Sequence, residues 1–91
     1  MNLLGQFLYS ALGTICRDEK LAASLVGSVQ DVRTLAAWHL GLINKKPIPR
    51  LAKGWRAEVV GNVIEDLLDG KLAITIENPT SDQPLKILKA D

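Results

Sequence analysis

The spacing of apolar residues changes at Gly70, and this change divides the chain into a helical part and a short β part. Before Gly70, residues 55–69 carry apolar side chains on one face and polar side chains on the other, the repeat of an amphipathic helix. The apolar face consists of Val59, Val60, Val63, Ile64, Leu67 and Leu68, and the polar face of Glu58, Asn62, Glu65, Asp66 and Asp69. The pattern predicts a helix that ends at Gly70.

After Gly70, Leu72, Ile74 and Ile76 occupy every second position, which is the repeat of a strand. Residues 78–82 are rich in turn formers, and a second alternation follows at Leu85 and Ile87. We therefore expect a hairpin of residues 72–77 and 85–89. A lone hairpin is marginally stable in water, so it should lie on the helices or pair with another chain.

The first part of the chain contains three further helical segments. Residues 2–16 place apolar side chains at helical spacing, although Gly5 and Gly13 weaken the pattern. Residues 18–26 form a short second segment, which we expect to end at Gly27 in the left-handed conformation. A capping box of Ser28 and Asp31 then predicts a helix over 29–43, ended by Asn44. Its apolar stripe is Val32, Leu35, Ala36, Leu42 and Ile43, widened by Ala37, Trp38 and Leu40.

Two prolines, Pro47 and Pro49, exclude a regular helix from residues 45–49, and residues 50–53 can form a single turn. Hydrophobic residues make up 47% of the 91 residues, but four are aromatic, so the core must consist mainly of Leu, Ile, Val and Ala. The sequence predicts one mainly α domain over 1–91. It is a small bundle of about four helices within 2–69, with a C-terminal β-hairpin at about 72–89.

The net charge of +1 conceals a strong segregation of charge along the chain. Residues 1–31 carry two basic and three acidic residues, whereas residues 58–91 carry three basic and seven acidic ones. Residues 32–57 contain no acid, and their basic residues are Arg33, Lys45, Lys46, Arg50, Lys53 and Arg56. Segregation of this kind indicates a binding surface for an anionic partner.

No residue set typical of an enzyme or a metal site stands out. Glu65, Asp66 and Asp69 could in principle hold a hard metal ion, but a solvated polar helix face is the favoured interpretation. We expect His39 to be half-buried and hydrogen-bonded, and Cys16 to be a small packing residue. We therefore predict no catalytic residue, no metal and no cofactor.

The single cysteine fits a reducing compartment, and the N-terminus lacks the basic region of a secretory signal. The apolar run that starts at Leu3 is too short to cross a membrane. We expect a soluble cytoplasmic protein without a membrane partner.

The predicted nucleic-acid site consists of Lys45, Lys46, Arg50, Lys53, Arg56 and Trp55. The basic residues lie on a loop and at the start of the 55–69 helix, whose free N–H groups suit a phosphate. The alternative is an ordinary solvated loop, balanced by the acidic last third of the chain. Trp55 could stack on a base, although a buried core anchor is the favoured role for it.

Residues 21–71, LAASLVGSVQDVRTLAAWHLGLINKKPIPRLAKGWRAEVVGNVIEDLLDGK, resemble the C-terminal helical region of ribonuclease D, which is related to HRDC (helicase and RNase D C-terminal) domains. The resemblance covers about 50 residues, and its most specific part is Gly54-Trp55-Arg56-Ala57-Glu58, after the proline-containing loop and the Trp38-His39 pair. It implies an HRDC-like helical bundle that helps an exonuclease to hold structured RNA. The exonuclease itself, with its four metal-binding acids, has no counterpart here, and the hairpin lies outside the resemblance.

Two functions therefore remain open. The first is a free-standing, non-catalytic accessory module that binds nucleic acid, with RNA favoured over DNA. The alternative is a protein–protein interaction or assembly subunit, with a protein partner or a second copy of the chain bound through the hairpin edge. An enzyme ranks below both.

Overall fold

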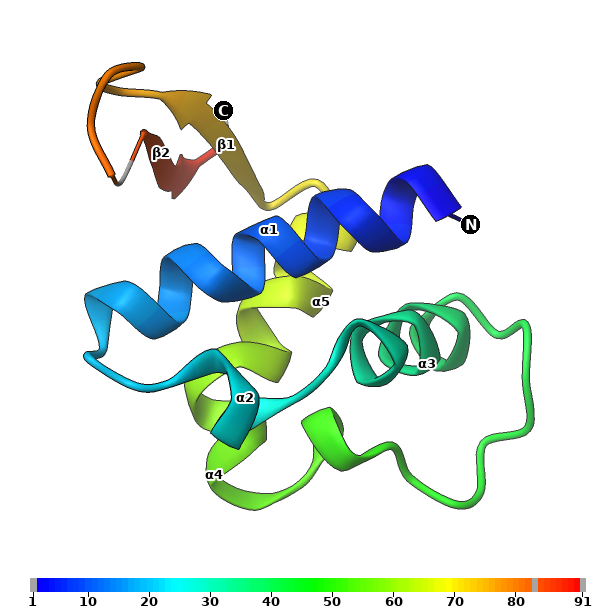
Figure 1. Cartoon of the computed structure of the whole chain (residues 1–91). Coiled ribbons are helices and arrows are strands. Elements are labelled where there is room, and N and C mark those ends of the chain that lie inside the picture. Colours follow the sequence, from blue (N-terminus) through cyan, green and yellow to red (C-terminus); the bar gives the residue numbers. More distant parts are fainter. Residues whose placement is uncertain (1, 83, 91) are drawn as a thin grey trace.

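The computed structural model describes residues 2–82 and 84–90. The described helical segments precede a two-stranded sheet (Figure 1). In chain order the elements are α1 (Asn2–Asp18), α2 (Ala23–Val26), α3 (Val29–His39), the 3₁₀ turn η1 (Arg50–Ala52), α4 (Gly54–Arg56), the π turn η2 (Ala57–Gly61), α5 (Asn62–Leu68), β1 (Leu72–Ile76) and β2 (Leu85–Lys89). The predicted mainly helical fold with a C-terminal hairpin is confirmed.

The core is aliphatic, as expected from the small number of aromatic residues. Helix α1 lies across the helical part and packs against both α3 and α5 (Figure 1). The largest fully buried side chains are Leu8, Leu12, Leu35, Leu51, Ile64, Val26, Val32, Val60 and Cys16. Burial raises the pKa of the Cys16 thiol, because a thiolate would be poorly solvated there. Cys16 is therefore a packing residue, as predicted.

Helix α3 begins where the sequence predicted it but ends four residues early. Ser28 Oγ accepts a hydrogen bond from Asp31 N, and the Asp31 carboxylate accepts one from Ser28 N, so the capping box is present. The prediction that the helix runs to residue 43 is wrong, because Gly41 takes a φ of 75°. Leu42 N then donates to Ala37 O at 2.8 Å and Gly41 N to Trp38 O at 3.2 Å, the Schellman arrangement that ends a helix.

As a consequence, Leu42 and Ile43 do not belong to the apolar stripe of this helix. They lie beyond its end and are exposed, Leu42 by 64% of its surface. Gly70 ends α5 by the same arrangement, with a φ of 76°, as the sequence predicted.

The predicted boundaries of the first two helices are also corrected. Helix α1 extends to Asp18, and Lys20 rather than a glycine takes the left-handed conformation after it, with a φ of 58°. Leu21 N donates to Cys16 O at 2.8 Å, which ends the helix, so residues 18–22 are not part of α2. Gly27 has an extended backbone with a φ of 177°, and the prediction of a left-handed cap there is wrong.

The helical run from α4 to α5 contains a π turn that the sequence pattern did not indicate. In η2, Asn62 N donates to Ala57 O, five residues back instead of four. The wider turn accommodates η1: a Cβ atom on Gly61 would overlap the carbonyl oxygen of Leu51. The absence of a side chain at Gly61 therefore allows Leu51 to be fully buried.

The hairpin has the predicted strands and lies on the helices. β1 and β2 are antiparallel, with Ile74 opposite Ile87. β1 packs against α5 and β2 against α1, where Ile87 is partly buried against the core. Arg17 of α1 donates a hydrogen bond to the carbonyl of Asp82 in the hairpin loop. Among the described helices, none combines the length and apolarity that a membrane span requires.

Candidate nucleic-acid interface

The connection from α3 to α4, residues 40–53, carries most of the predicted basic residues and is held at both ends. Near its start, the Trp38 indole N–H donates to Lys45 O at 3.0 Å. Near its end, Pro49 is buried and Leu51 is fully buried in the core. This irregular backbone therefore has fixed attachments to the helices.

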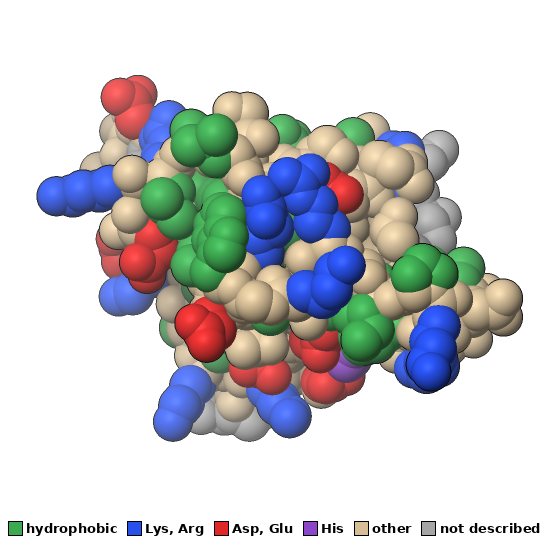
Figure 2. Space-filling model, turned by 90° about the horizontal axis from the view of Figure 1, so that it is seen from below, with side chains coloured by type: hydrophobic (Ala, Val, Ile, Leu, Met, Phe, Trp, Pro, Cys, Tyr) green, Lys and Arg blue, Asp and Glu red, His purple; other side chains and the backbone are tan. Residues whose placement is uncertain are grey.

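Three of the predicted basic residues, Lys46, Arg50 and Lys53, line one open groove of about 490 Å³, which we call the basic groove. Its remaining lining consists of Thr34, Ile43, Asn44, Pro47, Ile48 and Pro49. The face that lies at the bottom of Figure 1 is seen in Figure 2, where Lys and Arg side chains gather in the middle beside hydrophobic side chains. The grouping of three cations around one groove is not visible from the sequence alone.

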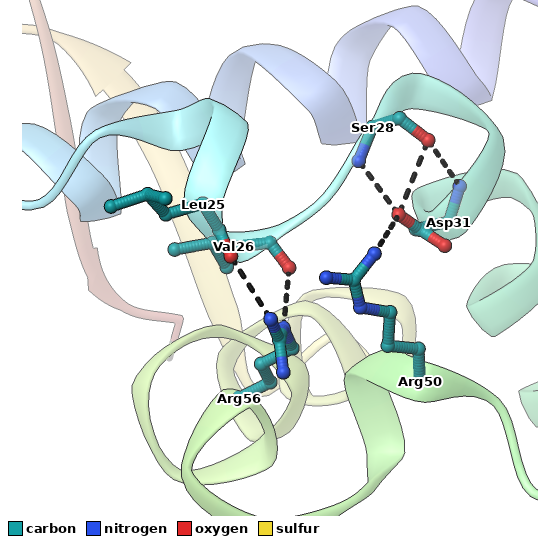
Figure 3. A network of polar contacts seen from close by, with 6 residues as sticks. All are labelled: Leu25, Val26, Ser28, Asp31, Arg50 and Arg56. Atoms are coloured by element: carbon teal, nitrogen blue, oxygen red, sulfur yellow. Dashed lines mark hydrogen bonds and ion pairs between the residues drawn. The ribbon is translucent and has the colours of Figure 1, made fainter.

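The cations of the basic groove are largely free of acidic partners. Arg50 lies 3.9 Å from Asp31, whose carboxylate already caps α3 (Figure 3). With the Arg50 side chain 55% exposed, such a pair contributes little to stability and leaves the guanidinium accessible. Within residues 2–82 and 84–90, Lys46 and Lys53 form no ion pair, and both are exposed.

Lys45 does not line the basic groove, and its side chain contacts α3. Its Nζ lies 5.1 Å from the centroid of the Trp38 ring and donates to Trp38 O at 3.4 Å. A cation over an aromatic ring is a stabilising contact in its own right. The structure thus gives Lys45 a role in attaching the connection, and it does not bring Lys45 together with the groove residues.

Arg56 is also engaged within the protein. Its Nε donates to Val26 O at 2.9 Å and one of its terminal nitrogens donates to Leu25 O at 3.1 Å (Figure 3). These carbonyls lie at the end of α2, where backbone acceptors have no helical partner. Arg56 therefore fastens α4 to α2, a role that its place in the basic segment did not indicate.

Trp55 is not the buried core anchor that the sequence favoured, because 46% of its surface is exposed. Leu51, four residues earlier in the chain, is fully buried in the core. The Arg56 guanidinium lies over the indole, 4.4 Å from its centroid. The predicted contribution of the helix start to phosphate binding stays a prediction, since α4 comprises three residues before the π turn.

Two carboxylates, that of Glu65 in α5 and that of Asp69 just after it, contact His39. His39 Nε2 lies 2.7 Å from Asp69 Oδ1, and His39 Nδ1 lies 3.5 Å from Glu65 Oε2. The His39 side chain is 18% exposed, in accord with a half-buried, hydrogen-bonded residue. In the part of the chain that the structure describes, no group of three or more His, Cys, Asp or Glu residues is arranged to hold a metal ion.

Comparison with known proteins relates the chain to ribonuclease D. It is 35% identical to ribonuclease D of Cronobacter turicensis over 49 residues, which are 54% of this chain and 13% of that protein. It is 29% identical to ribonuclease D of Escherichia coli K12 over 59 residues, or 65% of this chain and 16% of that protein. The chain thus matches about a sixth or less of the length of these curated relatives. No family model and no solved structure matches it.

Proposed function

We propose that this chain is a non-catalytic module that binds RNA through the basic groove, in the manner of an accessory domain of ribonuclease D. The observation that carries the proposal is the convergence of Lys46, Arg50 and Lys53 on one open groove. Such cations contact phosphates and give affinity that is independent of base sequence.

The partial similarity to ribonuclease D supports RNA as the ligand, because that protein's name describes a nuclease of RNA. The resemblance of residues 21–71 to the C-terminal helical region of that family, which implies a bundle that helps an exonuclease to hold RNA, adds support. The exonuclease activity is not part of the proposal.

The state of the two reactive side chains supports a non-catalytic role. The two ring nitrogens of His39 contact the carboxylates of Glu65 and Asp69. Cys16 is buried, and burial raises the pKa of its thiol. A nucleophile with a general base within hydrogen-bond reach is the arrangement that acyl or phosphoryl transfer commonly needs. Neither side chain lines the basic groove.

The test is RNA binding at several salt concentrations, measured by fluorescence anisotropy of a labelled single-stranded RNA. With three phosphates contacted, the logarithm of the affinity should fall with the logarithm of salt concentration with a slope of about −2. The variant Lys46→Ala/Arg50→Ala/Lys53→Ala should lose most of the affinity and most of this slope.

A matched control removes the same charge from the other side of the molecule. Lys71→Ala/Lys86→Ala/Lys89→Ala lowers the net charge equally, but its substitutions lie at the hairpin. It should retain most of the affinity of the wild type. Equal losses in both variants, or no binding by the wild type at low salt, would contradict the proposal.

The hairpin supports a second candidate, a protein–protein contact. Ile76 is 65% exposed and Leu88 is 40% exposed, although both belong to strands. The open edges of a two-stranded sheet can add a strand from another chain. Sedimentation at several concentrations, with Ile76→Lys as the disrupting variant, tests for self-association. A strictly monomeric wild type would exclude a second copy as the partner.

A further inference from the structure

We propose that the RNA bound by this chain is single-stranded, and that one unpaired base stacks on Trp55. This inference rests on the proposed RNA binding and adds the class of RNA. It also assigns Trp55 a role that differs from phosphate binding.

The Trp55 indole is held in a fixed position. One face of Trp55 is covered by the Arg56 guanidinium, 4.4 Å from the ring centroid. That guanidinium is itself held by hydrogen bonds to Val26 O and Leu25 O (Figure 3). Because Arg56 is anchored on α2, the indole is held in place before any ligand arrives, so stacking costs little further conformational entropy.

A large part of the Trp55 side chain remains open to solvent. With one ring face in contact with Arg56, 46% of the Trp55 surface is still exposed. An exposed tryptophan of this kind is costly in water and is a platform on which any nucleobase can stack. The guanidinium beneath the ring can also add to the stack, since arginine itself stacks on planar groups.

Trp55 also lies close in the chain to the basic groove. Lys53 lines the basic groove and precedes Trp55 by two residues, so their Cα atoms are within about 7.6 Å. Leu25, whose carbonyl oxygen accepts a hydrogen bond from Arg56, is also 63% exposed. Figure 2 shows Lys and Arg side chains beside hydrophobic ones on this face of the molecule. We therefore expect a single nucleotide to reach both residues, with its phosphate at Lys53 and its base at Trp55.

This arrangement favours single-stranded over double-stranded RNA. Bases in a duplex are stacked on one another, so their faces are not available to an indole at the surface of a protein. A single strand offers both its phosphates and its base faces, and it can satisfy the groove and Trp55 together.

The experiment compares three RNAs of equal length: a single strand, a duplex and a single strand with abasic positions. Trp55→Ala should weaken binding of the intact single strand by about 5- to 150-fold, the range measured for loss of one base stack. Trp55→Phe should keep most of the affinity, and Phe7→Ala removes an aromatic side chain of similar exposure on α1 as a control. Circular dichroism of each variant establishes that the fold is retained. If the alanine variant unfolds, Trp55→Leu, which keeps an apolar side chain but has no aromatic face, carries the test and should lose affinity in the same way.

The abasic strand separates stacking from a general loss of affinity. Wild type should bind it more weakly than the intact strand, whereas Trp55→Ala should bind both alike. If Trp55→Ala changes single-strand and duplex affinities equally, or changes neither, while the triple groove variant still loses binding, base stacking is wrong and the groove proposal stands. If the wild type binds none of these RNAs at low salt, both proposals fail.

Discussion

The connection over residues 40–53 and the hairpin both lie outside the helical core, yet they are attached to it by different means. The connection has irregular backbone but inserts a fully buried side chain, Leu51, into the core. The hairpin has regular hydrogen bonding, but none of its described strand residues is fully buried, and Ile87 makes the partial contact. Side-chain burial therefore fixes the basic groove more firmly than regular secondary structure fixes the hairpin.

Leu51→Ala should have the largest effect, because it removes the buried attachment of the connection. We expect the free energy of unfolding to fall by about 2–5 kcal/mol, the range for cavity formation at a buried leucine. RNA affinity should fall as well, since Arg50 and Lys53 flank this residue. Urea denaturation measures the first effect and anisotropy the second. A stability loss below about 1 kcal/mol would contradict the comparison.

Gly61→Ala attacks the same attachment from the other side. Its Cβ would overlap the Leu51 carbonyl, so the backbone must shift, at a cost near the upper end of about 1–3 kcal/mol for overpacking. Gly13→Ala is the matched control, because no atom lies within 4 Å of the Cβ it adds in helix α1. That control should stabilise the protein by about 0.5–1 kcal/mol. Thermal unfolding measures both effects, and Tm should fall in Gly61→Ala and rise in Gly13→Ala. A change of Tm in the same direction in both variants would contradict this prediction.

The two glycines that end α3 and α5 test whether the basic groove depends on the start of its connection. Gly41 and Gly70 have φ values of 75° and 76°, and nothing lies within 4 Å of an added Cβ at either. Alanine should therefore cost about 1–2 kcal/mol at both positions. We expect RNA affinity to fall in Gly41→Ala and to stay unchanged in Gly70→Ala, because only Gly41 begins the connection. Equal affinities would show that the groove does not depend on this turn.

Ile87→Ala should destabilise the protein least among the destabilising variants. Ile87 is partly buried, so we expect a loss of about 1 kcal/mol, a fraction of the value for full burial. RNA affinity should match that of the wild type, in contrast to Leu51→Ala. If Ile87→Ala lowers RNA affinity, the hairpin supports the basic groove. The connection and the hairpin would then not differ in their effect on RNA binding.

The sequence indicated most of the fold where the signal was local. The capping box at Ser28, the stop at Gly70 and the alternation of the strands all depend on residues close in sequence, and each is present. The end of α3 was missed because Gly41 lies within an apolar run that continues to Ile43. Lys20 was missed because a lysine rarely takes positive φ.

The candidate site was less predictable because its geometry depends on contacts between distant residues. Six side chains formed one basic or aromatic segment in the sequence, but the structure separates them. Arg56 contacts carbonyls about 30 positions earlier, and Lys45 contacts Trp38 seven positions earlier. Trp55 is exposed although it lies at the start of an amphipathic pattern, whereas Leu51 four residues earlier is buried. None of these contacts has a signal in charge or periodicity.

The π turn η2 changes the direction in which the side chains of α4 point relative to those of α5. Each residue of an α-helix turns the chain by about 100°, and η2 includes one residue more than an α-helical turn. Trp55 and Arg56 therefore face a direction rotated by about that angle from their direction in an unbroken helix with α5. Deleting one residue from 57–61 would restore a regular helix and turn Arg56 away from the carbonyls of α2. The length of this segment therefore determines which way Arg56 faces.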